Sequence, residues 1–145
     1  MTSRRGFALA AALLAIMLIA ALVAGVFLAA AEETRIGSAS SAKEAALWAA
    51  ESAIELTMRG WPSFAQDSLA VSGVRSLTID AFGTPVSVSV TRLDSTLFAI
   101  VAEARLLSSP SAATRRIGVI ARVHLAPNHS ITIDRVPERW WSELF

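Results

Sequence analysis

The 145-residue sequence contains no cysteine and no tyrosine. Without cysteine, neither a disulfide framework nor a thiolate metal site can form. An excess of charge of one sign is also missing. Two of the 13 basic residues, Arg4 and Arg5, lie at the N-terminus, and the remaining 11 stand against 12 acidic residues. This balance provides no basic surface for nucleic acid, so we expect no nucleic-acid partner.

Proline is absent before Pro62, and residues 7–31 contain no charged residue. These 25 apolar residues are long enough, at about 1.5 Å rise per residue, to cross a hydrocarbon core of about 30 Å as a helix. We therefore expect a basic leader at residues 1–6, a transmembrane helix at residues 7–31 and an extramembrane continuation of the same helix at residues 32–60. Gly60 and Pro62 provide the stop signal.

The charges that flank the apolar run predict its orientation. Arg4 and Arg5 precede it, whereas Glu32 and Glu33 follow it. Basic residues stay preferentially on the cytoplasmic side of a membrane. The sequence thus predicts a single-pass protein of the inner membrane, with a cytoplasmic N-terminus, membrane lipid around the helix and a periplasmic C-terminal domain.

The N-terminal segment has two further interpretations as an export signal. Small residues at positions 29–31 satisfy the rule for signal-peptide cleavage, although an apolar region of about 7–15 residues is usual and this one is longer. The residues SRRGF at positions 3–7 also fit the twin-arginine export pattern at several positions. Both interpretations remain open at the level of the sequence.

The layout of the N-terminal half resembles that of type IV pilins and pseudopilins. A basic leader ends at Gly6, Phe7 follows, and a long apolar helix runs on into AALWAAESAIE at residues 45–55, which is similar to the distal first helix of minor pilins. The resemblance implies that a prepilin peptidase cleaves between Gly6 and Phe7 and methylates Phe7. It also implies other pilins or pseudopilins as partners.

One position departs from the family pattern. Major pilins have a glutamate at the fifth residue of the mature chain, and counting from Phe7 this position is Ala11. Tip pseudopilins also lack the glutamate. The resemblance therefore implies a low-copy subunit at or near the tip of a filament.

The remainder of the chain predicts an α+β fold in which the single long helix packs on one antiparallel sheet of about four strands, formed by residues 61–145. Leu47, Ala50, Ile54 and Met58 recur at helical spacing and should cover the sheet. From residue 77 the apolar period changes to two, which is typical of strands. The strands are expected at residues 77–82, 86–91, 98–106 and 117–125, with a loop at residues 108–113 and a further edge strand at residues 131–133. In the strand at residues 117–125, alternate residues from Ile117 to Leu125 should face inward.

Candidate sites for chemistry are few. His124 and His129, with downstream acids, allow a metal-site interpretation, but their spacing matches no known zinc site, so we expect His124 on the solvent face and His129 in a turn. Trp140 and Trp141 either seal the end of the sheet or form an interface with a neighbouring subunit. We expect no enzyme activity, metal or cofactor.

The sequence thus leads to two functional hypotheses. The first is a minor pilin or pseudopilin that helps to initiate or cap a type IV pilus or a type II secretion pseudopilus. The alternative is a periplasmic domain of unknown binding function that is held by a signal anchor or exported by the secretory or twin-arginine route.

Overall fold

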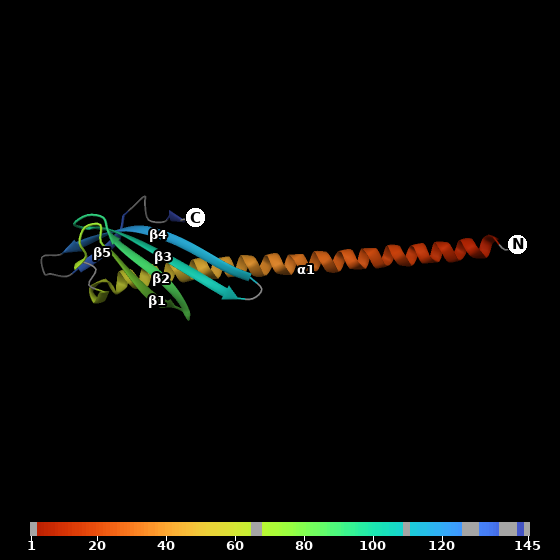
Figure 1. Cartoon of the computed structure of the whole chain (residues 1–145), viewed down its shortest axis with the longest axis horizontal. Coiled ribbons are helices and arrows are strands. Elements are labelled where there is room, and N and C mark those ends of the chain that lie inside the picture. The colour runs from red at the N-terminus through yellow and green to blue at the C-terminus, as the bar shows by residue number, and fades with distance from the viewer. Residues whose placement is uncertain (1–2, 65–67, 109–110, 126–130, 137–141, 144–145) are drawn as a thin grey trace. The chain divides into compact units, whose positions relative to one another are not determined.

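The computed structural model describes residues 3–64, 68–108, 111–125, 131–136 and 142–143. Its elements are one long helix, one short 3-10 helix and six strands. They are α1 (Ser3–Arg59), η1 (Trp61–Phe64), β1 (Val74–Ala81), β2 (Thr84–Arg92), β3 (Leu97–Ser108), β4 (Ser111–Leu125), β5 (Ile131–Arg135) and β6 (Ser142–Glu143). Figure 1 labels α1 and β1 to β5.

The predicted α+β class, with one long N-terminal helix and one antiparallel sheet, is confirmed. The strands lie in the order β1-β2-β3-β4-β5, and every neighbouring pair is antiparallel. The four expected strands correspond to β1 to β4, and the expected edge strand is β5. The two-residue β6, which the sequence did not predict, pairs with β4 beside β5.

The chain divides into two compact units, residues 1–38 and residues 39–145. In the first unit the chain is helical from Ser3, because it contains no proline and consists mostly of alanine, leucine and other residues compatible with a helix. Side chains of residues 7–37 are exposed, so no other described part of the protein covers this apolar segment. Its backbone polar groups nevertheless find partners within the helix, which is what a lipid environment requires.

The second unit has a single core between the C-terminal part of α1 and one face of the sheet. The face of α1 in this core is composed mainly of alanine, at positions 42, 46, 49, 50 and 53, together with Ile54. The facing strands contribute alternate residues, as the pleat of a strand requires. On β2 and β3, the fully buried residues are Val86, Val88, Val90, Ile100, Ala102 and Ala104.

One end of the core is closed by aromatic and arginine side chains. Trp61, placed by the turn at Gly60, packs edge to face on Phe98 with 4.8 Å between ring centroids. The guanidinium of Arg92 lies 5.5 Å from the centre of the Phe98 ring and donates hydrogen bonds to the carbonyl oxygens of Leu69, Asp94 and Ser95. Arg92 thereby fixes both the segment before β1 and the turn between β2 and β3.

Two expectations about β4 are wrong. The predicted loop at residues 108–113 is too long, because β4 begins at Ser111 and Ala113 is buried in the core. Leu125 was expected to face inward but is 71% exposed. Burial decreases along the strand from Ala121 through Val123 to Leu125, so the core ends before the strand does.

Candidate functional site

The leader and the predicted cleavage point lie in the first turns of α1. The backbone of Arg4, Arg5 and Gly6 is helical, Phe7 is 78% exposed, and Ala11 is exposed on the helix surface. Cleavage after Gly6 would leave the helix to begin at Phe7. The structure therefore places the four residues of the proposed processing signal on one continuous helix with the apolar run.

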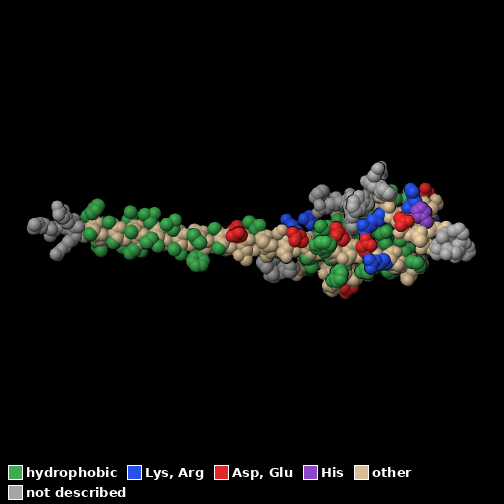
Figure 2. Space-filling model, turned by 180° about the vertical axis from the view of Figure 1, so that it is seen from behind, with side chains coloured by type: hydrophobic (Ala, Val, Ile, Leu, Met, Phe, Trp, Pro, Cys, Tyr) green, Lys and Arg blue, Asp and Glu red, His purple; other side chains and the backbone are tan. Residues whose placement is uncertain are grey.

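The described part of the chain contains one helix that is long and apolar enough to cross a membrane. Its most apolar stretch has a mean hydropathy of 2.9, and none of this stretch is buried within the protein. Figure 2 shows hydrophobic side chains along the visible face of this part of α1 and mixed charges over the sheet domain. A signal sequence near the N-terminus has the same properties, so these features indicate a membrane-competent segment and leave its processing open.

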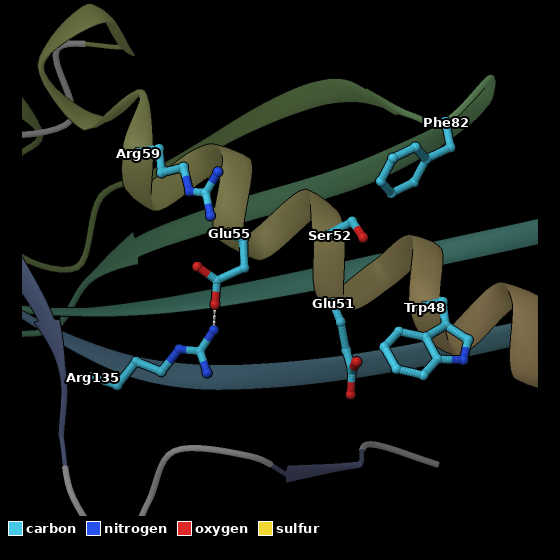
Figure 3. Close-up of a pocket in the computed structure, with 7 residues that line it drawn as sticks. All are labelled: Trp48, Glu51, Ser52, Glu55, Arg59, Phe82 and Arg135. Carbon is cyan, nitrogen blue, oxygen red and sulfur yellow. Dashed lines mark ion pairs between the residues drawn. The ribbon is translucent and has the colours of Figure 1, made fainter.

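A groove of about 310 Å³ lies on the second unit, and we call it the α1 groove. Its floor is the outward face of α1, where side chains at three- and four-residue spacing line up. Its walls come from the two sides of the sheet, since Phe82 follows β1 and Arg135 ends β5 (Figure 3). The lining residues are Trp48, Glu51, Ser52, Glu55, Arg59, Phe82 and Arg135.

The charged side chains of the α1 groove follow one another along the helix axis. In the middle, Arg135 forms an ion pair with Glu55. Glu51 lies toward one end and Arg59 lies at the other. Within the described parts of the chain, neither Glu51 nor Arg59 forms an ion pair or a hydrogen bond through its side chain. The groove thus has a neutralised centre between an unpaired carboxylate and an unpaired guanidinium.

Two exposed aromatic side chains occupy the Glu51 end of the groove. Trp48 is 68% exposed and Phe82 is 91% exposed, and Figure 3 shows both at the end opposite Arg59. Neither was identified as a site residue from the sequence. Trp48 lies on the side of the helix opposite to the predicted packing stripe. Phe82 was expected within the strand at residues 77–82, whereas β1 ends at Ala81 and Phe82 lies in the turn that follows. Aromatic residues on loops or outward helix faces were the signal that could have identified them.

Phe82 also has an unusual backbone conformation. It and Gly83 are the two central residues of the β1–β2 turn, and their φ values are 55° and 79°. Positive φ at both positions is typical of the two-residue type I′ turn, in which asparagine, aspartate or glycine is preferred. A bulky side chain in the left-handed region costs about 1–2 kcal/mol. The side chain is nearly fully exposed, so burial does not offset this cost.

The predicted packing residues of the helix differ in their burial. Ala50 and Ile54 are completely buried, whereas Leu47 and Met58 are partly buried and pack against the edge of the core. The alanines at positions 42, 46, 49 and 53 complete the buried face, although the sequence interpretation had concentrated on larger side chains. Their three- and four-residue spacing was visible in the sequence.

The histidine and tryptophan candidates are only partly described. His124 is exposed, as is Arg122 on the same face, and its Nε2 lies 3.9 Å from Oδ2 of Asp134. No group of three metal-ligating side chains occurs among the described residues. His129, Trp140 and Trp141 lie outside the described residues.

No family model, curated protein or solved structure matches this chain. The architecture itself is pilin-like, because a long apolar N-terminal helix continues into a segment that packs on an antiparallel sheet. Any functional assignment therefore depends on this architecture and on the residues described above.

Proposed function

We propose that this chain is a minor pilin or pseudopilin, a membrane-held and non-enzymatic subunit that helps to initiate or cap a type IV pilus or a type II secretion pseudopilus. The observation that carries the proposal is the uninterrupted helix α1, whose apolar first part begins next to Gly6 and whose last part packs on one face of the sheet in the core of the domain. Such a helix joins a membrane anchor to a folded domain without a hinge-forming proline.

The proposal includes a place in the cell and a set of partners. Arg4 and Arg5 favour a cytoplasmic N-terminus, so the sheet domain would lie in the periplasm, or at the pilus tip after assembly. The partners are the prepilin peptidase, other pilins or pseudopilins and the lipid of the inner membrane. No cofactor or nucleic acid is part of the proposed activity.

A specific observation also favours the alternative of an exported or anchored periplasmic domain. The second compact unit begins at residue 39. Cleavage after Ala31 would consequently leave that unit intact, with seven residues before it. This alternative predicts a different mature N-terminus, and one measurement distinguishes the two.

The deciding experiment is mass spectrometry of the N-terminal peptide of the protein purified from its own membranes. Prepilin processing gives N-methylated Phe7, and signal-peptidase cleavage gives Glu32. A plain anchor retains the whole leader of residues 1–6 and begins with Met1. Gly6→Leu should abolish the methylated Phe7 peptide and leave membrane insertion unchanged, because insertion depends on the apolar run.

Gly25→Leu is the matched control for this experiment. A Cβ atom at Gly25 would meet nothing within 4 Å apart from its chain neighbours and the adjoining helix backbone, so the substitution should not disturb the fold. It should leave the methylated Phe7 peptide at its normal level. Normal maturation of the Gly6→Leu variant, or a wild-type chain that begins at Glu32, would refute the proposal.

A further inference from the structure

We propose that the α1 groove is a docking site for an extended segment of a partner protein that carries an arginine or lysine and, about four residues further along, an aspartate or glutamate. All residues of this site belong to the second compact unit. The proposal is therefore independent of how the N-terminus is processed, and it goes beyond membership of a filament by specifying the chemistry of a partner.

The first argument is charge complementarity. Glu51 and Arg59 have no charged partner among the described residues, whereas Glu55 and Arg135 between them neutralise each other. Eight residues of helix separate Glu51 from Arg59, which corresponds to about 12 Å along the axis. An extended chain advances about 3.3 Å per residue, so two side chains four residues apart span about 13 Å. They also point to the same side of the extended segment.

The second argument is the aromatic pair at the acidic end. Trp48 presents an exposed indole next to Glu51, and a cationic side chain that reaches this carboxylate would also contact the ring. Phe82 forms the adjacent wall and is held there in a backbone conformation that a bulky residue adopts at a cost. Conformational strain combined with nearly complete exposure indicates that Phe82 serves binding and not folding.

The third argument concerns the form of the partner. A helix is about 10 Å wide and carries side chains on all sides, so only one stripe of it could enter a groove of about 310 Å³. In an extended segment alternate side chains point to the same side, so the two charged side chains can enter the groove together while the backbone lies along its opening. The arginine or lysine of this segment would lie over Trp48 beside Glu51, and its carboxylate would pair with Arg59.

The test uses the full-length protein in lipid nanodiscs and a blocked, fluorescent nine-residue peptide of serine and leucine with arginine at its third position and glutamate at its seventh. Fluorescence anisotropy gives the dissociation constant. A peptide of identical composition with the two charges adjacent is the first control, and empty nanodiscs are the second. We expect the spaced peptide to bind at least fivefold more tightly than the adjacent one.

Substitutions then assign the contacts. Trp48→Ala should weaken binding of the spaced peptide at least fivefold, as for an aromatic contact that also stacks on the peptide cation. Glu51→Gln and Arg59→Gln should each weaken it about threefold, the size typical of an exposed ion pair. The effect of Glu51→Gln should disappear when the peptide arginine is replaced by uncharged citrulline.

The matched control variants are Glu103→Gln and Arg105→Gln, which remove one acid and one base from exposed positions on β3. They should leave the dissociation constant unchanged. Equal binding of the spaced and adjacent peptides, equal effects of the groove and control variants, or no saturable binding at millimolar peptide would each overturn the proposal.

Discussion

The turn between β1 and β2 has a left-handed backbone at both central residues, Phe82 and Gly83. The side chain of Asp80 stabilises it by accepting a hydrogen bond from the Gly83 amide at 2.7 Å. Asparagine is the usual residue at the first of these positions, because its short polar side chain tolerates the left-handed region. Phenylalanine at this position weakens the turn and gains no buried area in return.

Replacing Phe82 by asparagine should therefore stabilise the sheet domain. We expect the free energy of unfolding to increase by about 1 kcal/mol, because the strain at positive φ is relieved and little buried apolar area is lost. Hydrogen exchange of the core amides in β2 and β3 measures this change, since these amides exchange through global opening.

The same variant should bind the spaced probe peptide less tightly than the wild type does. A gain in stability together with a loss of binding is the signature of a residue that serves function at the expense of the fold. A variant less stable than the wild type would contradict the strain argument.

At the scale of elements, α1 packs on the sheet through its smallest side chains. Ala46, Ala50 and Ala53 are completely buried against the valines of β2 and the alternate residues of β3. Because alanine side chains are small, the helix packs close to the sheet and little free space remains between them. Additional methylene groups in such a core would cause strain.

Ala50→Leu should accordingly destabilise the domain by about 1–3 kcal/mol through overpacking. Ala45→Leu is the matched control, because Ala45 is exposed on the same helix and both residues have high helix propensity. Chemical unfolding of both variants in mild detergent, followed by near-ultraviolet circular dichroism, measures the difference. Equal stability of the two variants would show that the buried face tolerates larger side chains.

At the scale of the whole molecule, one apolar helix that can cross a membrane is covalently continuous with a folded domain. A carboxylate inside the membrane costs several kcal/mol unless a partner neutralises it. In the proposed minor pilin, Ala11 would remove both this cost and the opportunity to pair with the N-terminus of a neighbouring subunit. A subunit without this carboxylate would be better suited to a position that occurs once in a filament than to the repeated positions of the shaft.

We therefore expect a low-copy subunit at or near the filament tip. Quantitative mass spectrometry of sheared filaments should find this chain as a minor component, and its deletion should reduce the number of filaments. The Ala11→Glu variant should enter the filament shaft more often, because it acquires the carboxylate that major pilins possess. Dominance of the wild-type chain in filaments, or an unchanged number of filaments after its deletion, would contradict this prediction.

The sequence alone predicted the features that depend on local patterns. An apolar run without proline determines a long helix, and alternating valines at positions 86, 88 and 90 determine the inward face of a strand. These patterns also led to the α+β class and to the expected edge strand at residues 131–133. They failed at Leu125, because alternation specifies a face of the strand but not where the core ends.

Only the tertiary structure assembled the α1 groove. Trp48, Phe82 and Arg135 are far apart in the sequence, and they meet because β1 and β5 lie on opposite sides of the sheet with α1 packed across it. The ion pair between Glu55 and Arg135 leaves Glu51 as the unpaired acid of the groove, although the two glutamates are indistinguishable in the helix pattern. Pairings of this kind follow from strand order and helix packing, and these long-range contacts leave no periodic signal in the sequence.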